Sequence, residues 1–325
     1  MTGGPIVVIG GGGFIGSHVC AALRRDRIPT VAVGRTAPVP VISGDDIAER
    51  DFVEVNLDDW DRLAPLMAGA ETVICLASSS LPASSNDDMG AEVHQHVEAT
   101  VGLAQMAARI GVRRFVFASS GGTVYGRAST VSVDELSPME PMSAYGVSKL
   151  AIENYLRVLG NLTSMQTLSL RVANPYGPGQ RTDRRHGFIS TAIECGLRGS
   201  PLVIWGDGST RRDFVFIEDV AQAFVAASRY DGPYPVINIG SGEATSLLEA
   251  VACVQEVLNV ELDVRFEPGR PVDVPVNSLA INRAEAELDW RPTVDLKTGI
   301  RETAKTRAVV DRVEPDAMKG SSVAR

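Results

Sequence analysis

Short apolar runs alternate with helical stretches along the first half of the chain. The apolar runs, rich in Val and Ile, cover residues 6–9, 30–33, 52–55, 72–76 and 115–118. Their length and composition predict strands buried on both faces, and the stretches between them, such as residues 14–25, predict helices. This alternation is typical of right-handed βαβ units on a parallel sheet, where ligands bind at the carboxyl ends of the strands.

The second half has a different pattern. A strand at 167–172 runs into Asn174-Pro175-Tyr176-Gly177-Pro178-Gly179, whose Pro and Gly residues indicate a turn or loop. Beyond it we expect shorter strands at 202–205, 213–217 and 236–239, and helices at 218–228 and 246–258. These elements predict a smaller, mixed α/β lobe. Residues 314–325 carry few apolar groups, and we expect a disordered tail there.

Composition narrows the class of protein. The 325 residues are 44% hydrophobic, enough for a large core, and they contain no apolar run of membrane-spanning length, so we expect a cytoplasmic protein. A formal net charge of -9 argues against nucleic acid and membrane partners, so any phosphate site must be built locally. The four cysteines form no C-x-x-C pair, and no metal site is indicated.

The first apolar run leads directly into a glycine-rich turn. Gly10, Gly13 and Gly16 lie in the segment Gly10-Gly-Gly-Gly13-Phe14-Ile15-Gly16, between a predicted strand and a predicted helix. Glycines permit the tight turn and let a pyrophosphate approach the backbone, while the helix N-terminus stabilises its charge. We therefore predict a Rossmann-type, doubly wound parallel sheet that binds NAD(P), with residues 1–175 as the dinucleotide-binding domain and 176–313 mainly as the substrate lobe. Some later segments return to the first domain.

The end of the second strand bears on the choice between NAD and NADP. A carboxylate there would bind the ribose hydroxyls of NAD, but this chain has Gly34-Arg35. An arginine can pair with a 2′-phosphate, so the local chemistry leans toward NADP, with Arg35 contacting the adenosine ribose or its phosphate. A solvated surface arginine beside NAD remains the alternative.

A tyrosine and a lysine begin a later predicted helix. Tyr145 and Lys149 are spaced i,i+4 in Ser143-Ala-Tyr-Gly-Val-Ser-Lys149, so they lie on one helix face. A nearby ammonium and an oxidised nicotinamide both favour the phenolate, so Tyr145 could take a hydroxyl proton while hydride leaves the same carbon.

With these motifs in order, the chain resembles the extended short-chain dehydrogenase/reductase family and, within it, the nucleotide-sugar epimerase/dehydratase group. The resemblance is nearly full length and rests on several motifs: the glycine loop, Ser119-Ser-Gly-Gly-Thr-Val-Tyr125-Gly, Tyr145 to Lys149, Arg171-Val-Ala-Asn174-Pro-Tyr-Gly-Pro, Trp205-Gly-Asp-Gly-Ser-Thr-Arg-Arg212-Asp-Phe, Asn238-Ile-Gly-Ser-Gly and Arg270-Pro-Val-Asp273.

The resemblance implies roles for further residues. It places Phe14 and Ile15 with the cofactor loop, Asn56 and Leu57 near the adenine, and Leu76 and Ala77 near the pyrophosphate and ribose. It also implies a nucleoside diphosphate sugar, UDP-linked, in the second lobe, with Asn174, Arg212 and Arg270 near the diphosphate and residues 202–205 beside the base. Asn277 falls at the position that limits the bulk of the sugar, which leaves hexose, hexosamine and uronate open. A homodimer formed through a helix pair is implied as well.

One position departs from the family pattern. A Ser or Thr that hydrogen-bonds the reacting sugar hydroxyl usually precedes Tyr125 by four residues, and here that position is Gly121. Thr123, Ser120 or a water must supply the hydroxyl, and we favour Thr123. Gly122 and Thr123 also replace the acids that dehydratases and decarboxylases carry there, which disfavours those reactions.

Three functions remain open. The leading hypothesis is a nucleotide-sugar 4-epimerase that oxidises C4 transiently, and the second is an NADPH-dependent reductase of a nucleotide 4-keto sugar. The third is a regulator that senses a dinucleotide without catalysis, against which the retained Tyr145 and Lys149 argue. No role is assigned to His18, His94 or His96, which we interpret as surface or packing residues.

Overall fold

The structure is a computed structural model of the full chain. It describes residues 4–36, 52–78, 85–127, 132–182, 187–269 and 274–317, with side chains up to residue 307.

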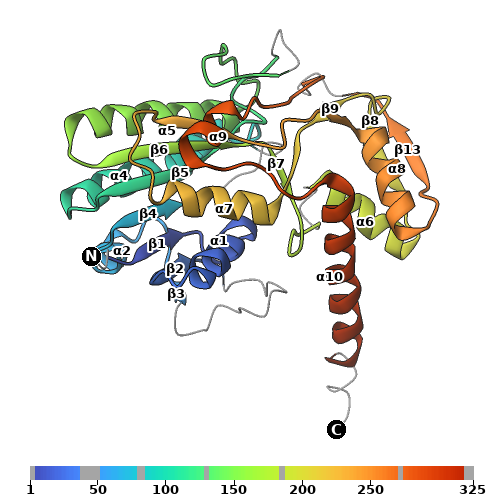
Figure 1. Ribbon diagram of the computed structural model, residues 1–325, viewed down its shortest axis with the longest axis horizontal. Helices are drawn as coiled ribbons and strands as arrows, with labels where there is room; N and C mark the ends of the chain where they lie inside the picture. Colours follow the sequence, from blue (N-terminus) through green and yellow to red (C-terminus); the bar gives the residue numbers. More distant parts are fainter. Residues whose placement is uncertain are drawn as a thin grey trace.

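A parallel sheet organises the first lobe (Figure 1). Within the described ranges it has seven strands in the order β11-β6-β5-β4-β1-β2-β3, all parallel. The strands are β1 (Ile6–Ile9), β2 (Thr30–Gly34), β3 (Phe52–Glu54), β4 (Thr72–Cys75), β5 (Arg114–Ser120), β6 (Gln166–Val172) and β11 (Val236–Ile239). The order of the strands switches at β1: β2 and β3 are added on one side of it, and β4, β5 and β6 on the other. This switch confirms the predicted doubly wound α/β fold of Rossmann type.

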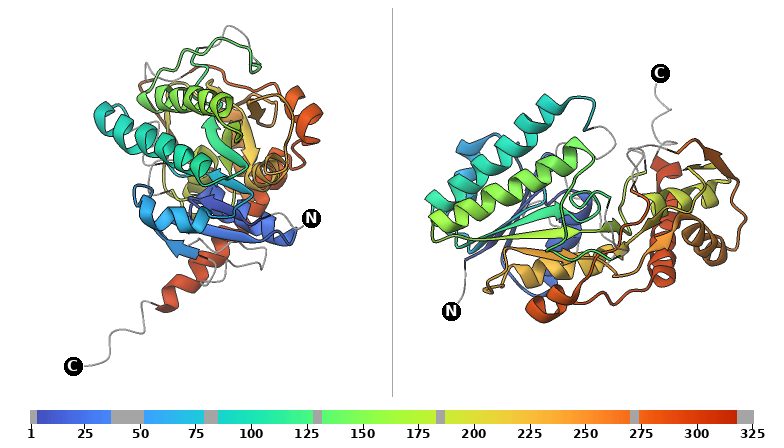
Figure 2. Two further views of the ribbon diagram at one scale, coloured as in Figure 1. Left: turned by 90° about the vertical axis from the view of Figure 1, so that its left-hand side faces the viewer. Right: turned by 90° about the horizontal axis from the view of Figure 1, so that it is seen from above.

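Both faces of this sheet are buried, as the continuous apolar runs predicted. Alternate residues of one strand pack into opposite clusters: Val8 lies in one core and Val7 in the other. Helices cover the two faces, with α4 and α5 on one side and α1 and α7 on the other (Figures 1 and 2). The helices of this lobe are α1 (Phe14–Arg25), α2 (Trp60–Met67), α3 (Met89–Glu92), the π-helical segment η2 (Val93–Glu98), α4 (Ala99–Arg109), α5 (Ala144–Leu162) and α7 (Ile217–Ala227).

The second lobe lies beyond the carboxyl ends of the strands (Figure 1). It packs α6 (Phe188–Arg198) and α8 (Leu247–Leu258) together and adds the paired strands β8 (Leu202–Trp205) and β13 (Val264–Glu267). Two further pairs connect it to the first lobe: β7 (Asn174–Tyr176) with β10 (Phe214–Phe216), and β9 (Arg211–Arg212) with β12 (Thr245–Ser246). The remaining helices are α9 (Asn282–Leu288) and α10 (Leu296–Ala317).

Three sequence interpretations need correction. The strand expected in the second lobe at 236–239 is β11, which instead extends the main sheet by pairing with β6. The strand expected at 213–217 is shorter, because Ile217 already begins α7. Helix α10 runs to Ala317, past the expected start of a tail at residue 314, and residues 318–325 lie outside the described part. None of the described helices is long and apolar enough to cross a membrane.

Candidate functional site

The glycine loop joins β1 to α1 at the carboxyl end of the sheet. Gly10 has φ +85°, a left-handed conformation that favours glycine, and a β-carbon there would lie 2.8 Å from the Ala77 nitrogen. A β-carbon on Gly16 would lie 2.1 Å from the Gly10 oxygen, so helix and turn touch directly. Helix α1 begins after Gly13, whose position provides no side-chain cap for the first amides. The loop therefore fits a dinucleotide pyrophosphate, which would bind to these amides.

The other predicted cofactor residues surround this loop. The Leu76 amide donates to the Ile9 oxygen at 2.8 Å, which places Leu76 and Ala77 against Gly10. Gly34 and the exposed Arg35 end the neighbouring strand β2. The rest of the predicted set lies at the same edge: Phe14 and Ile15 at the start of α1, and Asn56 and Leu57 after β3.

Helix α5 brings Tyr145 and Lys149 to the carboxyl end of β5. Ser143 caps this helix by accepting a hydrogen bond from the Gly146 amide, and the Tyr145 amide donates to Ser85 Oγ at 3.0 Å. Lys149 is buried, and its Nζ donates to the Ala118 oxygen at 2.8 Å and lies 5.2 Å from the centre of the Tyr145 ring. The predicted pair is thus assembled on one helix face.

Burial dominates the protonation of the pair in the protein alone. Burial raises the pKa of Tyr145 above its ordinary value and the charge of Glu92 raises it further, while a hydrogen bond from Ser78 lowers it. Burial lowers the pKa of Lys149 to about 8. In the protein alone, desolvation disfavours the charged form of both groups, so the acidic phenol, which was predicted from the lysine and an oxidised nicotinamide together, stays a prediction for the complex with cofactor.

The space beside Gly121 explains the departure from the family pattern. A β-carbon added at Gly121 would lie 2.4 Å from Leu279 Cδ1, so Leu279 fills the volume of the usual Ser or Thr side chain. Thr123 Oγ1 is buried, and none of the described residues is its hydrogen-bond partner. A β-carbon on Gly146 would lie 2.9 Å from the Thr123 oxygen, which shows that Thr123 packs against the start of α5. Ser120 ends β5, and its backbone oxygen accepts from the Thr123 amide.

Restoring a serine at this position should therefore strain the core. We expect Gly121→Ser to lower the free energy of unfolding by about 1–3 kcal/mol, the usual range for overpacking. Combining it with Leu279→Ala should cost less than the sum of the two single changes, since the second change removes the clash. Urea unfolding of the three variants measures this coupling, and strictly additive losses would contradict it.

Two of the predicted substrate residues, Asn174 and Asn277, lie at the same strand end. Asn174 lies beside Gly122, whose added β-carbon would be 3.7 Å from Asn174 Oδ1. Asn277 is buried and donates through Nδ2 to the Gly121 oxygen at 3.0 Å, while its Oδ1 lacks a partner among the described residues. Arg212 Nη1 donates to the Val274 oxygen at 2.6 Å. Arg270 lies outside the described residues.

The sequence matches the NAD dependent epimerase/dehydratase family over residues 6–240, a span that includes the glycine loop, Thr123 and the Tyr145–Lys149 pair. The chain belongs to this family.

Individual relatives cover almost the whole chain. It is 31% identical over 320 residues to a dTDP-4-dehydro-6-deoxyglucose reductase of Escherichia coli, covering 93% of this chain and 96% of the relative. It is 34% identical over 306 residues to a UDP-glucose 4-epimerase of Mycolicibacterium smegmatis, covering 92% of this chain and 97% of the relative. The solved structure of the UDP-glucose 4-epimerase of Thermotoga maritima with UDP-glucose superposes on this chain with a TM-score of 0.87 at 28% identity. The match covers 94% of this chain and 99% of that one.

Four motif residues of this epimerase/dehydratase family member, together with Glu153, form a buried polar network under the site. Tyr125 donates to Asn238 Oδ1 at 2.7 Å and accepts from Arg171 Nη1 at 2.9 Å. Arg171 also pairs with Glu153 of α5 at 2.6 Å, and Ser119 donates to the same carboxylate. Burial raises the pKa of Tyr125 to about 12, so its phenol stays neutral. These residues hold β5, β6, β11 and α5 together.

Sequence reasoning missed three polar residues beside the pair. Ser78 follows β4 and hydrogen-bonds the Tyr145 phenol. Glu92 and His96 form a buried pair in contact with Tyr145, although no role had been assigned to the histidine. Only Ser78 carried a usable signal, since it follows a strand at the predicted ligand-binding edge.

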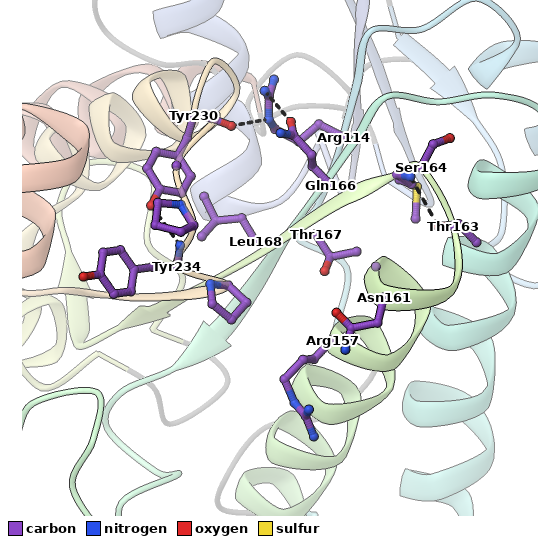
Figure 3. Close-up of a pocket in the computed structure, with 15 residues that line it drawn as sticks. Arg114, Arg157, Asn161, Thr163, Ser164, Gln166, Thr167, Leu168, Tyr230 and Tyr234 are labelled. Carbon is purple, nitrogen blue, oxygen red and sulfur yellow. Dashed lines mark hydrogen bonds between the residues drawn. The ribbon is translucent and has the colours of Figure 1, made fainter.

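A separate hollow of about 270 Å³ opens at the opposite end of the sheet, where β5 and β6 begin (Figure 3). Arg114 lines it and donates to the backbone oxygens of Tyr230 at 2.8 Å and Ser228 at 2.5 Å. Because protein acceptors already bind this guanidinium, Arg114 connects the sheet to the segment after α7. The hollow is distinct from the predicted cofactor site because it lies at the other end of the strands.

Proposed function

We propose that the protein is a nucleotide-sugar 4-epimerase that oxidises C4 of a UDP-hexose, UDP-hexosamine or UDP-uronate transiently. The observation that carries this proposal is the pairing of Tyr145 and Lys149 on one face of α5, with Lys149 Nζ on the Ala118 oxygen at 2.8 Å and 5.2 Å from the centre of the Tyr145 ring. Relatives named UDP-glucose 4-epimerase, matched over nearly their full length, support it.

The side chains divide the chemistry among them. A nicotinamide cofactor, which the glycine loop would hold, would supply a reversible hydride acceptor for C4. Tyr145 takes the proton of the C4 hydroxyl and gives it back, and the Lys149 ammonium stabilises the phenolate while it exists. Thr123 hydrogen-bonds the reacting hydroxyl, with Ser120 as the other candidate. Asn174 and Arg212 donate to the diphosphate, as does Arg270.

Two hydroxyl variants separate Thr123 from Ser120. We expect Thr123→Val to lower kcat by about tenfold, because one hydrogen bond to the reacting group is lost, and Ser120→Ala to have a smaller effect. Steady-state kinetics on the epimerised sugar measure both. A larger loss for Ser120→Ala would transfer the role to Ser120.

The decisive assay omits any reductant. Purified protein should interconvert UDP-glucose and UDP-galactose, or their acetamido or uronate analogues, because hydride returns to the substrate and the cofactor ends unchanged. Strict dependence on stoichiometric NADPH, with a nucleotide 4-keto sugar as substrate, would remove the epimerase proposal.

That second outcome describes the other candidate, a nucleotide 4-keto-sugar reductase. It is favoured by the match to the dTDP-4-dehydro-6-deoxyglucose reductase and by the arginine at the end of β2. In that reaction Tyr145 would donate its proton to the ketone oxygen rather than recover it.

The cofactor proposal concerns the 2′ position of the ribose. The family is NAD dependent, and we propose that Arg35, exposed after Gly34, gives this chain a preference for NADP. Titration of both cofactors into wild type and Arg35→Ala tests it. Equal affinities in the variant together with a wild-type preference for NAD would count against it.

The pH dependence of activity follows from Lys149. Its pKa is lowered to about 8 by burial, so the ammonium is present below that pH and is lost as the pH rises through it. We expect kcat/KM to fall above about pH 8, and Lys149→Arg to move this fall to higher pH because a guanidinium keeps its charge. Kinetics from pH 6 to 10 measure both, and a fall near the ordinary lysine value would contradict the assignment.

We also propose that the protein is a homodimer formed through α5. Its surface carries four partly exposed apolar residues at helical spacing, namely Val147, Tyr155, Val158 and Leu162. Light scattering tests this, and a monomer would refute it.

A further inference from the structure

Both histidines of the π-helical segment η2 pair with a glutamate at i,i+4 spacing, His94 with Glu98 of η2 and His96 with Glu92 at the end of α3, in opposite environments. His94 Nδ1 lies 2.6 Å from Glu98 Oε2, and both side chains are more than 60% exposed. His96 Nδ1 lies 3.0 Å from Glu92 Oε1, with exposures of 0% and 2%. Burying two ionisable groups costs desolvation energy, and π-helical turns are frequent at functional sites, so the buried pair requires an explanation that the exposed pair does not.

The buried imidazole is neutral and has a free acceptor. Burial and, to a smaller extent, the charge of Lys149 lower the pKa of His96 to about 4, against the opposing effect of Glu92. Nδ1 therefore donates to the Glu92 carboxylate, which leaves the lone pair on Nε2. Nε2 is buried, and among the described residues it has no hydrogen-bond partner. A buried acceptor of this kind is unfavourable unless something donates to it.

Helix α5 and strand β4 present the titratable groups near this imidazole and its pair. From α5, the Tyr145 ring lies 6.0 Å from the His96 ring, and Lys149 is close enough to affect its protonation. Glu153 of α5 acts on Lys149 but is bound by Arg171. From β4, burial raises the pKa of the Cys75 thiol to about 11, so it stays neutral.

Lys149 is the cation among these groups. Its ammonium has three donors, one of which binds the Ala118 oxygen, so it has donors to spare for an acceptor beside it.

We propose that His96 is a positioning residue joined to the Lys149 ammonium through one bridging water, which accepts from Nζ and donates to His96 Nε2. Glu92 fixes the imidazole tautomer, and the water bridge to Nε2 holds Nζ beside Tyr145 and favours its charged form. The inference rests on the proposed function only in treating Lys149 and Tyr145 as the catalytic pair.

Nitrogen NMR tests the contact without any substrate. The chain has four histidines, so ¹⁵N-histidine labelling gives few signals, and His96→Gln assigns the one of interest. We expect His96 to be the neutral Nδ1–H tautomer from pH 5.5 to 8. Lys149→Met should shift its Nε2 signal, whereas the matched change His94→Asn should not. Protonation of His96 near pH 6.5, or an Nε2 signal unmoved by Lys149→Met, would overturn the proposal.

Kinetics provide a second readout in variants that keep the fold. His96→Asn, which keeps an amide near the Nδ1 position, should lower kcat about tenfold, leave KM within about twofold and move the alkaline fall of kcat/KM to lower pH. His96→Gln should recover most of the rate, because its Oε1 replaces Nε2. Equal losses in the two variants, or the same loss in His94→Asn, would show a packing role instead. If His96→Asn does not fold, the NMR result decides.

The two proposals fail separately. A protein that acts on no nucleotide sugar but shows the coupled His96 signal would overturn the proposed function and retain this inference. A protein that epimerises sugars while Lys149→Met leaves the His96 signal unchanged would do the reverse.

Discussion

Replacing Tyr145 by phenylalanine should lower kcat about 10²- to 10⁴-fold, the usual contribution of a general acid–base residue. The variant keeps the ring that packs near His96 and loses only the hydroxyl that moves the proton, so the fold and the cofactor affinity should remain close to those of wild type. Turnover of the UDP-sugar pair and titration of NAD measure the two effects separately.

The matched control is a tyrosine remote from the site. Tyr234 is 42% exposed and lines the hollow at the opposite end of the sheet, so Tyr234→Phe should leave kcat within about twofold. If Tyr145→Phe retained full activity, the proton would have to move through another group, and the catalytic account would be wrong. If Tyr145→Phe lost cofactor affinity as well, the main role of the hydroxyl would be to bind the cofactor rather than to transfer a proton.

The parts of the fold that follow from local sequence were predicted well. Strands β1 and β8 agree with the expected bounds because each is an apolar run between a proline and a glycine, and helix α1 does so because its amphipathic stretch follows the glycine loop and ends in charged residues. Strand β11 could be predicted as a strand but not placed in the right sheet. Its partner β6 ends 64 residues earlier, and no local pattern specifies that pairing.

The site shows the same division. Gly10, Gly16, Tyr145 and Lys149 could be predicted because each motif combines a conformation or a spacing with a chemical need. The protonation of the pair could not, because it depends on burial, which the sequence does not display. Likewise, Leu279 fills the space beside Gly121 from a position 158 residues away, and only the folded chain reveals that contact.

The buried ion pair beneath the site should make a large contribution to stability. We expect Glu153→Gln to lower the free energy of unfolding by about 3–5 kcal/mol, because it leaves the buried Arg171 guanidinium without a compensating charge. This loss is a large fraction of the stability of an ordinary domain. Urea unfolding at fixed cofactor concentration measures it, since bound cofactor stabilises the folded state by itself.

An exposed ion pair supplies the comparison. Glu256 pairs with Lys297 where both side chains are about half exposed, so Glu256→Gln should change the free energy of unfolding by no more than about 1 kcal/mol. The contrast depends on desolvation, because each substitution removes the same charge from one partner of an ion pair. Similar small changes in both variants would mean that water reaches Arg171. The network of Tyr125, Arg171 and Glu153 would then be too weak to fix the position of α5, and with it that of Lys149, against the sheet.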